Sequence, residues 1–271
     1  VAGRISRGIF RIGAKDYRLA VNNPPNHLHG GEDGLDRRLW KAEPCGEDTL
    51  LLRYHSPDGE EGYPGNVDLS VTYRLTPGAE LVIESAARTD AATPVSLTNH
   101  SYFNLAGEGS GSAADHLVEI FADEYVPADA ALTLSGERTP VRAGGNDLRS
   151  GVAVRDLASR LHLGHGDNYL LRPSPDGRPV LVARLADPSS GRKLEVRTDE
   201  SCLQFYTGVF LDGTFTGKSG VPYTRHAGLC FECQGYPDGV AHPDLGDILV
   251  HPDQPRCRKT SYAFGVVADA A

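Results

Sequence analysis

Residues 69–75 decide the fold class. They read Leu69-Ser70-Val71-Thr72-Tyr73-Arg74-Leu75, with apolar and polar side chains alternating without a break. Successive side chains of a β-strand point to opposite faces, so this alternation predicts a strand with one buried face. Comparable strand-like runs lie at residues 81–86, 117–121, 180–185, 194–198, 203–210 and 229–234.

Turn-forming sequences separate these runs, for example Ser56-Pro57-Asp58-Gly59 and Ser174-Pro175-Asp176-Gly177. Proline presets φ at the first corner of such a turn, and glycine accepts a positive φ. Short strands with regular turns between them predict an all-β sandwich or barrel. We expect one short helix at residues 147–158, although Gly151 lies inside it. Because no repeat or linker divides the chain, we expect residues 1–271 to form a single domain.

Charge and hydropathy exclude two classes of partner. The net charge is −9 and no cluster of Lys or Arg appears, which argues against binding to nucleic acid. No apolar run approaches the ~20 residues that span a bilayer, so we expect no membrane segment. Residues 1–10 contain no continuous apolar core, so we do not expect a signal peptide there.

The five cysteines indicate a reducing compartment. Cys230 and Cys233 have the C-x-x-C spacing, but they lie in a strand-like run. Three residues of strand span about 10 Å, which is too far for a disulfide between them. A zinc site of this type needs a second such pair, and the sequence has none. We therefore expect reduced thiols and a cytoplasmic protein.

Polar residues inside strand-like segments are the candidates for chemistry, because a buried polar side chain costs free energy unless it is paired or used. If residues 97–105 form a strand, Thr98, His100 and Tyr102 share one face, which suits a polyol better than a core. Glu232 lies in the middle of an otherwise apolar segment. Burial there raises a carboxylate pKa toward that of a working base, but an ion pair explains the residue equally well.

Three further segments carry polar groups. A loop with two prolines and two glycines contains His27 and His29, which either orient a substrate or only hydrogen-bond to the backbone. A metal site at these histidines is less favoured, because no carboxylate or cysteine stands at ligand spacing nearby. Gln204 lies in another strand-like run, and a glycine-rich turn presents Asp167.

Taken in order, these segments resemble the aldose 1-epimerase (galactose mutarotase) family. The resemblance covers essentially the whole chain, and it is carried by Gly3-Arg4-Ile5, Asn26-His27-Leu28-His29-Gly30-Gly31, Thr98-Asn99-His100-Ser101-Tyr102-Phe103-Asn104-Leu105, Asp167-Asn168-Tyr169, Gln204-Phe205-Tyr206-Thr207-Gly208 and Glu232-Cys233-Gln234-Gly235-Tyr236-Pro237-Asp238. The second and third strings are highly specific. The resemblance implies a large antiparallel β-sandwich, the galactose mutarotase-like supersandwich, with an open cleft for a pyranose.

The resemblance also implies roles for individual residues. By matching motifs, His100 corresponds to the general acid and Glu232 to the general base. The residues that correspond to hydroxyl-binding positions are Arg4, His29, Tyr102, Asp167 and Gln204. The implied reaction interconverts the α and β anomers of a free aldohexose such as galactose or glucose. It has no redox step, so the resemblance implies no cofactor and no metal, and the sequence contains neither G-x-G-x-x-G nor a P-loop.

The chain departs from the family pattern at three points. Family members carry several strands ahead of the arginine motif, whereas Arg4 is the fourth residue here, so we expect a frayed Arg4 and a bare sheet edge. Gly3 stands where family members usually have asparagine. The family's motif has one residue between its aspartate and its asparagine, whereas Asp167 directly precedes Asn168. Asp167 therefore matches the family's aspartate only after a one-residue shift, and without that shift Gly166 stands at the aspartate's position.

Three other functions stay open. A hexose-6-phosphate 1-epimerase of the same fold requires a basic cluster for the phosphate, and none lies near these motifs. A non-catalytic sugar-binding module fits if missing strands leave the cleft incomplete. Glycoside hydrolysis normally uses two carboxylates about 5–10 Å apart, whereas the pair here is one imidazole and one carboxylate. The sequence leaves the preferred aldose and the oligomeric state open.

Overall fold

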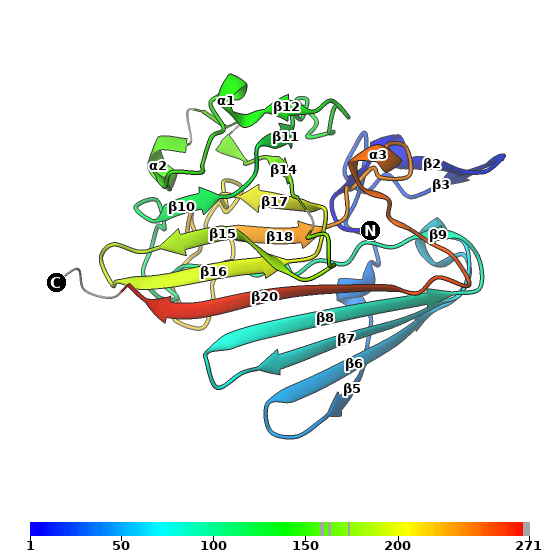
Figure 1. Cartoon of the computed structure of the whole chain (residues 1–271), viewed down its shortest axis with the longest axis horizontal. Coiled ribbons are helices and arrows are strands. Elements are labelled where there is room, and N and C mark those ends of the chain that lie inside the picture. Colours follow the sequence, from blue (N-terminus) through cyan, green and yellow to red (C-terminus); the bar gives the residue numbers. More distant parts are fainter. Residues whose placement is uncertain (158–159, 162–163, 173, 268–271) are drawn as a thin grey trace.

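The computed structural model describes residues 1–157, 160–161, 164–172 and 174–267. Within these residues, the longest strands form one antiparallel sheet of nine strands (Figure 1). In spatial order, they are β13 (Val152–Ala153), β10 (Leu117–Ile120), β15 (Val180–Ala186), β16 (Arg192–Thr198), β20 (Arg256–Val266), β8 (Glu80–Thr89), β7 (Val67–Leu75), β6 (Thr49–Ser56) and β5 (Lys41–Pro44). The alternating run at residues 69–75 lies in β7, between β6 and β8, as predicted.

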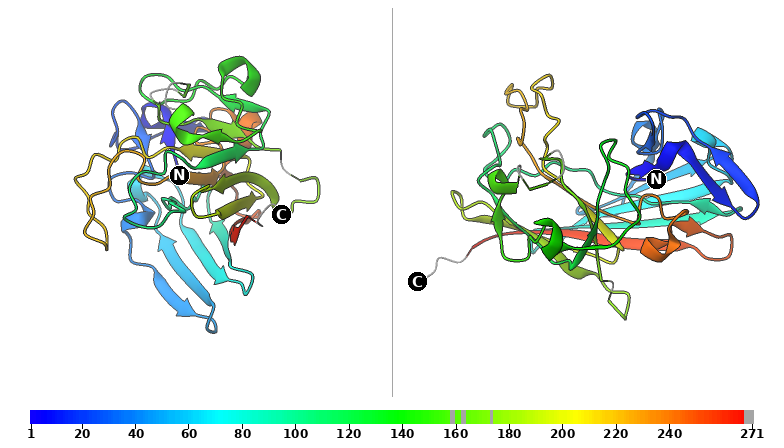
Figure 2. Two further views of the ribbon diagram at one scale, coloured as in Figure 1. Left: turned by 90° about the vertical axis from the view of Figure 1, so that its left-hand side faces the viewer. Right: turned by 90° about the horizontal axis from the view of Figure 1, so that it is seen from above.

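A second antiparallel sheet of five strands carries most of the polar motifs. In spatial order, its strands are β12 (Thr139–Pro140), β11 (Glu124–Val126), β14 (Asn168–Leu170), β17 (Cys202–Tyr206) and β18 (Cys230–Gln234). Figure 2 shows that the strands β5 to β8, in blue and cyan, extend beyond this smaller sheet.

The main hydrophobic core lies between the two sheets. The larger sheet contributes side chains such as Val118, Leu185, Val196 and Tyr262, and the smaller sheet contributes Tyr169, Leu203, Phe205 and Phe231. All of these are almost completely buried. The hydroxyl of Tyr262 donates a hydrogen bond to the Phe231 carbonyl across the interface, at 3.0 Å. The predicted antiparallel β-sandwich is confirmed.

Alternation in the smaller sheet sends polar residues to its other face. Phe205 and Phe231 point into the core, so their neighbours Gln204 and Glu232 point away from it. Asn168 precedes the core residue Tyr169 and also points to this outer face. The fold thus gathers carboxamides and one carboxylate on a single surface of a rigid sheet.

Short elements complete the structure. Three two-stranded pairs are β1 (Arg4–Ile5) with β4 (His27–Leu28), β2 (Ile9–Ile12) with β3 (Lys15–Arg18), and β9 (Thr93–Pro94) with β19 (Leu249–Val250). The short helices are α1 (Val141–Gly144), α2 (Val154–Leu157) and α3 (Pro243–Gly246), with 3₁₀ turns at η1 (Ser6–Gly8), η2 (Leu35–Arg37) and η3 (Glu60–Gly62). None of the helices built from described residues has the length and apolar character needed to cross a membrane.

Two secondary-structure predictions are wrong in part. The expected helix at residues 147–158 is helical only at α2, because Gly151 adopts φ +74° and the following β13 pairs with β10. Ala158 lies outside the described residues. Residues 97–102 do not pair as a strand, and only Phe103 of this segment forms a bridge, to Leu229. This segment instead lies beside β18, held by the hydrogen bond from the Thr98 hydroxyl to the Cys233 carbonyl and by the bridge of Phe103 to Leu229.

A buried ion-pair cluster gives a stability prediction. Glu200 is 3% exposed and lies 3.2 Å from Arg256 Nη2 and 3.4 Å from Arg258 Nε. Removal of the carboxylate leaves both arginines without their negatively charged partner. Glu200→Gln is therefore expected to lower the free energy of unfolding by about 3 kcal/mol. Urea denaturation measures this. Glu195→Gln, which removes a partly exposed ion pair with Arg184, is the control and should cost less than about 1 kcal/mol. Equal losses in both variants contradict the prediction.

Candidate active site

A row of polar side chains crosses three neighbouring strands of the smaller sheet. Asn168 of β14 is in register with Gln204 of β17, which is in register with Glu232 of β18. Directly opposite residues on adjacent antiparallel strands share a face and lie about 5 Å apart at Cβ. The three side chains therefore form a polar floor on the face that points away from the core.

His100 comes to this floor from the irregular segment that lies beside β18. The Thr98 hydroxyl donates a hydrogen bond to the Cys233 carbonyl at 2.9 Å, which anchors the segment beside β18. His100 Nε2 lies 3.5 Å from Glu232 Oε1. The imidazole also stacks on the Tyr102 ring, with 5.3 Å between the ring centroids. Hydrogen bonding and ring stacking thus fix the position of the imidazole without a strand.

Burial changes the acidity of Glu232. Its side chain is only 4% exposed, and desolvation raises its pKa from 4.5 to about 7. The positive charges of His100 and Arg4 act in the opposite direction. A carboxylate with a pKa near neutrality can both take up and return a proton at physiological pH.

Arg4 and His29 reach the site through a two-stranded pair. Arg4 is in register with Leu28, and its Nε donates a hydrogen bond to Asn23 Oδ1 at 3.0 Å. The backbone N–H of Gly3 donates to His29 Nδ1 at 3.2 Å. The expectation that Arg4 is frayed is therefore wrong: strand pairing and a side-chain hydrogen bond hold it in place, half-buried.

One cavity brings the predicted site residues together. Its volume is about 320 Å³, at the small end of the range for small-molecule sites. All seven residues predicted from the sequence line it: Arg4, His29, His100, Tyr102, Asp167, Gln204 and Glu232. We call this space the polar cavity. His29 lies at its exposed rim, His100 is half-buried and Glu232 lies at its base.

Asp167 lines the polar cavity, but its carboxylate also hydrogen-bonds to a residue outside the cavity. Its Oδ2 accepts a hydrogen bond from Asn146 Nδ2 at 2.9 Å, and the Asn146 carbonyl accepts one from the core residue Tyr169. Burial raises the pKa of Asp167 to about 7. Gly166, the alternative match to the family's aspartate, cannot carry a side chain, because a Cβ there would lie 1.9 Å from the Phe205 carbonyl oxygen.

Sequence reasoning missed several residues that line the polar cavity. Asn168 and Gln234 are completely buried, and His165 packs its ring 4.7 Å from that of Tyr206. Alternation along the strand already puts Gln234 on the face of Glu232, two residues away, but the sequence assigned it no role. The position of Asn168 could not be predicted, because it depends on the register between β14 and β17.

The two histidines of the rigid loop serve different purposes. His27 is fully buried, and its ring nitrogens contact the Ala20 carbonyl at 2.7 Å and the Tyr63 hydroxyl at 2.8 Å, so it is structural. His29 lies with His100 and Glu232 in a cluster in which one nitrogen or oxygen atom from each side chain is within 4.8 Å of the other two. Because His29 Nδ1 accepts the Gly3 N–H, its Nε2 carries the proton. A protonated nitrogen cannot ligate a metal, so this donor set does not fit a cation and instead offers a hydrogen bond.

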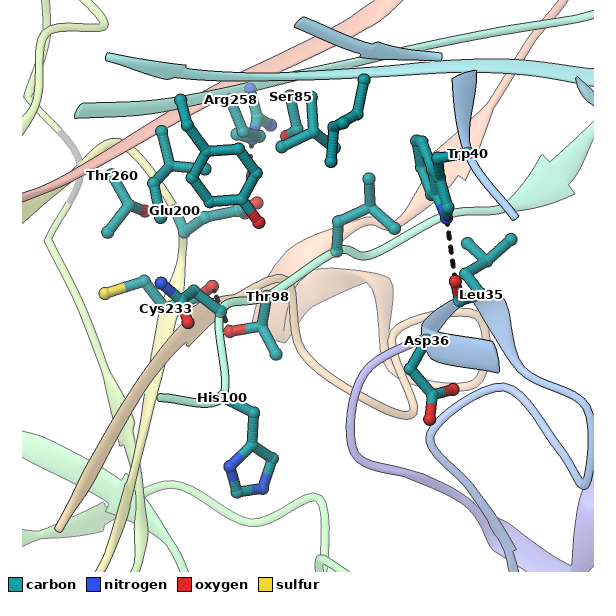
Figure 3. Close-up of a pocket in the computed structure, with 16 residues that line it drawn as sticks. Leu35, Asp36, Trp40, Ser85, Thr98, His100, Glu200, Cys233, Arg258 and Thr260 are labelled. Atoms are coloured by element: carbon teal, nitrogen blue, oxygen red, sulfur yellow. Dashed lines mark hydrogen bonds and ion pairs between the residues drawn. The ribbon is translucent and has the colours of Figure 1, made fainter. Parts of the chain in front are cut away.

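A second cavity lies beyond His100, against the nine-stranded sheet (Figure 3). It has a volume of about 450 Å³ and is lined by apolar side chains such as Trp40, Val71 and Ile83, together with polar ones such as Glu200 and Arg258. In Figure 3 the His100 ring points away from most of the side chains that line this cavity. This cavity is the less suitable one for the predicted chemistry, because Glu232 does not line it and its charged residues Glu200 and Arg258 pair with each other.

The relatives of this chain make it a carbohydrate epimerase. Within that class, the chain belongs to the aldose 1-epimerase family, whose model matches residues 1–263. It is 44% identical over 267 residues to human galactose mutarotase, covering 98% of this chain and 77% of the relative. It is 33% identical to the aldose 1-epimerase of Escherichia coli, covering 97% of this chain and 77% of that protein. The solved structure of an aldose epimerase homologue from C. elegans superposes with a TM-score of 0.91 at 28% identity, covering 99% of this chain and 81% of that one.

Proposed function

We propose that this protein interconverts the α and β anomers of free aldohexoses such as galactose or glucose, with Glu232 as general base and His100 as general acid. The observation that carries the proposal is the 3.5 Å separation of the His100 imidazole and the Glu232 carboxylate inside one polar cavity. The family of the chain supports the same reaction.

Ring opening moves two protons at atoms that share one carbon. Glu232 takes the proton of the C1 hydroxyl, whose oxygen forms the aldehyde carbonyl as the bond from C1 to the ring oxygen breaks. The ring oxygen takes a proton from His100. Rotation about the C1–C2 bond turns the other face of the aldehyde to the ring oxygen, and the reverse steps close the ring and return each proton to its source. Since the two oxygens are bound to the same carbon, the acid and the base must lie close together. General acid and general base catalysis each accelerate the reaction roughly 10²–10⁴-fold.

The remaining predicted residues are proposed to bind hydroxyl groups. His29 donates through Nε2, Gln204 offers a carboxamide from the floor, and Tyr102 stacks beside His100. Asp167 lines the same cavity, so we keep it in the proposed set. Arg4 is the single Arg or Lys among the described residues that line the polar cavity. One cation suits a neutral sugar better than a sugar phosphate.

We also propose a cytoplasmic location and a single domain. All five cysteines are free thiols, which suits a reducing compartment. One hydrophobic core joins side chains from Ile83 to Tyr262, which supports one folding unit over this range.

Polarimetry tests the proposed reaction. Freshly dissolved α-D-galactose or α-D-glucose drifts slowly to its equilibrium rotation, and the protein is expected to accelerate this approach in proportion to its concentration without changing the end point. Heat-denatured protein is the control for catalysis by buffer. If the native protein leaves both rates unchanged but binds either sugar, a non-catalytic sugar-binding module replaces the proposal.

The pH dependence of the rate is a second prediction. Because burial raises the pKa of Glu232 to about 7, kcat/KM is expected to fall about tenfold per pH unit below that value as the base becomes protonated. Arg4 lowers this pKa, so Arg4→Gln is expected to move the acidic limb to higher pH. Initial rates, corrected for the uncatalysed reaction at each pH, measure both profiles. An acidic limb near the ordinary value of 4.5 contradicts the assignment.

A further inference from the structure

We propose that the side-chain amides of Asn168 and Gln234 bind hydroxyl groups of the substrate and help to determine which sugar is accepted. This inference rests on the proposed function, because it assigns a sugar to the polar cavity. It adds two residues whose side chains belong to the floor of that cavity.

Both side chains are buried without a protein partner. Asn168 and Gln234 are each 0% exposed, and in neither residue does the amide oxygen or nitrogen form a hydrogen bond with the described residues. An unpaired buried polar group costs about 1–3 kcal/mol, which is why such groups are rare in folded proteins. Four unpaired atoms on one cavity wall indicate that their partner is a molecule that enters the cavity.

Their placement fits a pyranose whose C1 lies at Glu232. Asn168 is two strands away from Glu232 in the same cross-strand row, which corresponds to about 10 Å. That is the length of a hexose with its hydroxyl groups, so Asn168 lies under the end of the sugar that is remote from C1. Gln204 occupies the position between them.

Gln234 lies beside the row rather than in it. It is two residues from Glu232 along β18, or about 7 Å, on the same face. Its Nε2 is 3.4 Å from the point that a Cβ at Gly3 would occupy, and the Pro237 ring packs against the same point, with Cγ at 2.6 Å. Gly3, Gln234 and Pro237 all line the polar cavity, so the amide belongs to the wall that faces a bound sugar.

A carboxamide can discriminate between hydroxyl configurations. It offers a donor and an acceptor at fixed positions, so a hydroxyl of the wrong configuration leaves buried polar atoms unpaired. Sites that read a hydroxyl by hydrogen bonds reject analogues that lack it much more strongly than apolar pockets do. Asn168 is therefore expected to read the hydroxyls remote from C1, and Gln234 those on one side of the ring.

Binding of deoxy sugars to two variants tests the inference. Asn168→Leu and Gln234→Met keep approximate side-chain volume but remove the amide. Isothermal titration calorimetry measures the affinity of wild type and variants for galactose and for its 2-, 3-, 4- and 6-deoxy analogues. Each variant is expected to bind galactose about tenfold more weakly, as the loss of one good hydrogen bond implies. For one deoxy analogue, the variant and the wild type should bind equally, because the lost hydroxyl is the partner of the lost amide.

Thr93→Val is the matched control. Thr93 is 1% exposed and its hydroxyl also lacks a partner among the described residues, but it does not line the polar cavity. This variant is expected to keep the wild-type affinity for every sugar. If Asn168→Leu and Gln234→Met keep it as well, or weaken all five sugars by the same factor, the amides are structural or satisfied by water and the inference is wrong.

A measurement on the wild-type protein tests the inference even if the variants do not fold. In ¹⁵N-labelled protein, the side-chain NH₂ signals of Asn168 and Gln234 are expected to shift on addition of galactose, and unchanged signals overturn the inference. Because these experiments measure binding, they are independent of turnover. Shifted signals without accelerated mutarotation refute the proposed reaction alone, and accelerated mutarotation with unshifted signals refutes the amide assignment alone.

Discussion

Glu232→Gln is expected to abolish most of the catalysed mutarotation, with kcat lower by about 10²–10⁴-fold. Glutamine has the shape of glutamate but cannot accept a proton from the C1 hydroxyl. The carboxylate is buried at the base of the polar cavity, 3.5 Å from His100 Nε2, so no solvent-exposed group can easily replace it. Polarimetry with saturating sugar gives kcat, and calorimetry gives the affinity.

Affinity separates this role from a structural one. The amide that the substitution introduces can still hydrogen-bond to a hydroxyl, so the dissociation constant should change by less than about tenfold. Glu84→Gln, which removes an exposed carboxylate paired with Lys259 on the larger sheet, is the control and should keep both constants. A variant at position 232 with wild-type kcat, or one that loses sugar binding together with its fold, contradicts the assignment of the base.

Much of the fold could be predicted from local sequence because strand periodicity is a local property. The alternation at residues 69–75 predicted β7, and the apolar segment around Glu232 predicted β18. The prediction of a helix over residues 147–158 was wrong because the pairing of β13 with β10 outweighed the weak helix propensity of this segment. The segment 97–105 failed as a strand because its extended shape is fixed by single hydrogen bonds, such as that of Thr98, and not by a ladder.

The sequence motifs predicted most residues of the candidate site, but not those whose position depends on the register between strands. Residues of six separate motifs line one cavity, which no local pattern could establish. Asp167 illustrates the limit: the motif match puts it in the site, whereas its carboxylate hydrogen-bonds to Asn146 on the core side. The next residue, Asn168, has the register that puts its side chain in the row with Gln204. A shift of one residue reverses the face of a strand, so sequence alone could not choose between them.

His100→Asn is expected to lower kcat by about 10²–10⁴-fold while KM changes much less. Asparagine cannot deliver a proton to the ring oxygen, but it still fills the space next to Tyr102. The same substitution at the exposed His55, which contacts Asp68 at 2.7 Å, is the control and should leave both constants unchanged. If KM rises and kcat stays constant, His100 binds the sugar and another group is the acid.

The pH profile of the same variant adds a readout that a merely structural role would not move. The positive charge of His100 lowers the pKa of Glu232, against the larger effect of burial. Removal of the imidazole therefore raises the pKa of the base, and the acidic limb of the residual activity is expected to move to a pH above that of the wild type. His55→Asn should not move it. A limb that stays in place while kcat falls would mean that His100 and Glu232 do not interact in the working enzyme, and the paired acid and base would have to be sought elsewhere in the polar cavity.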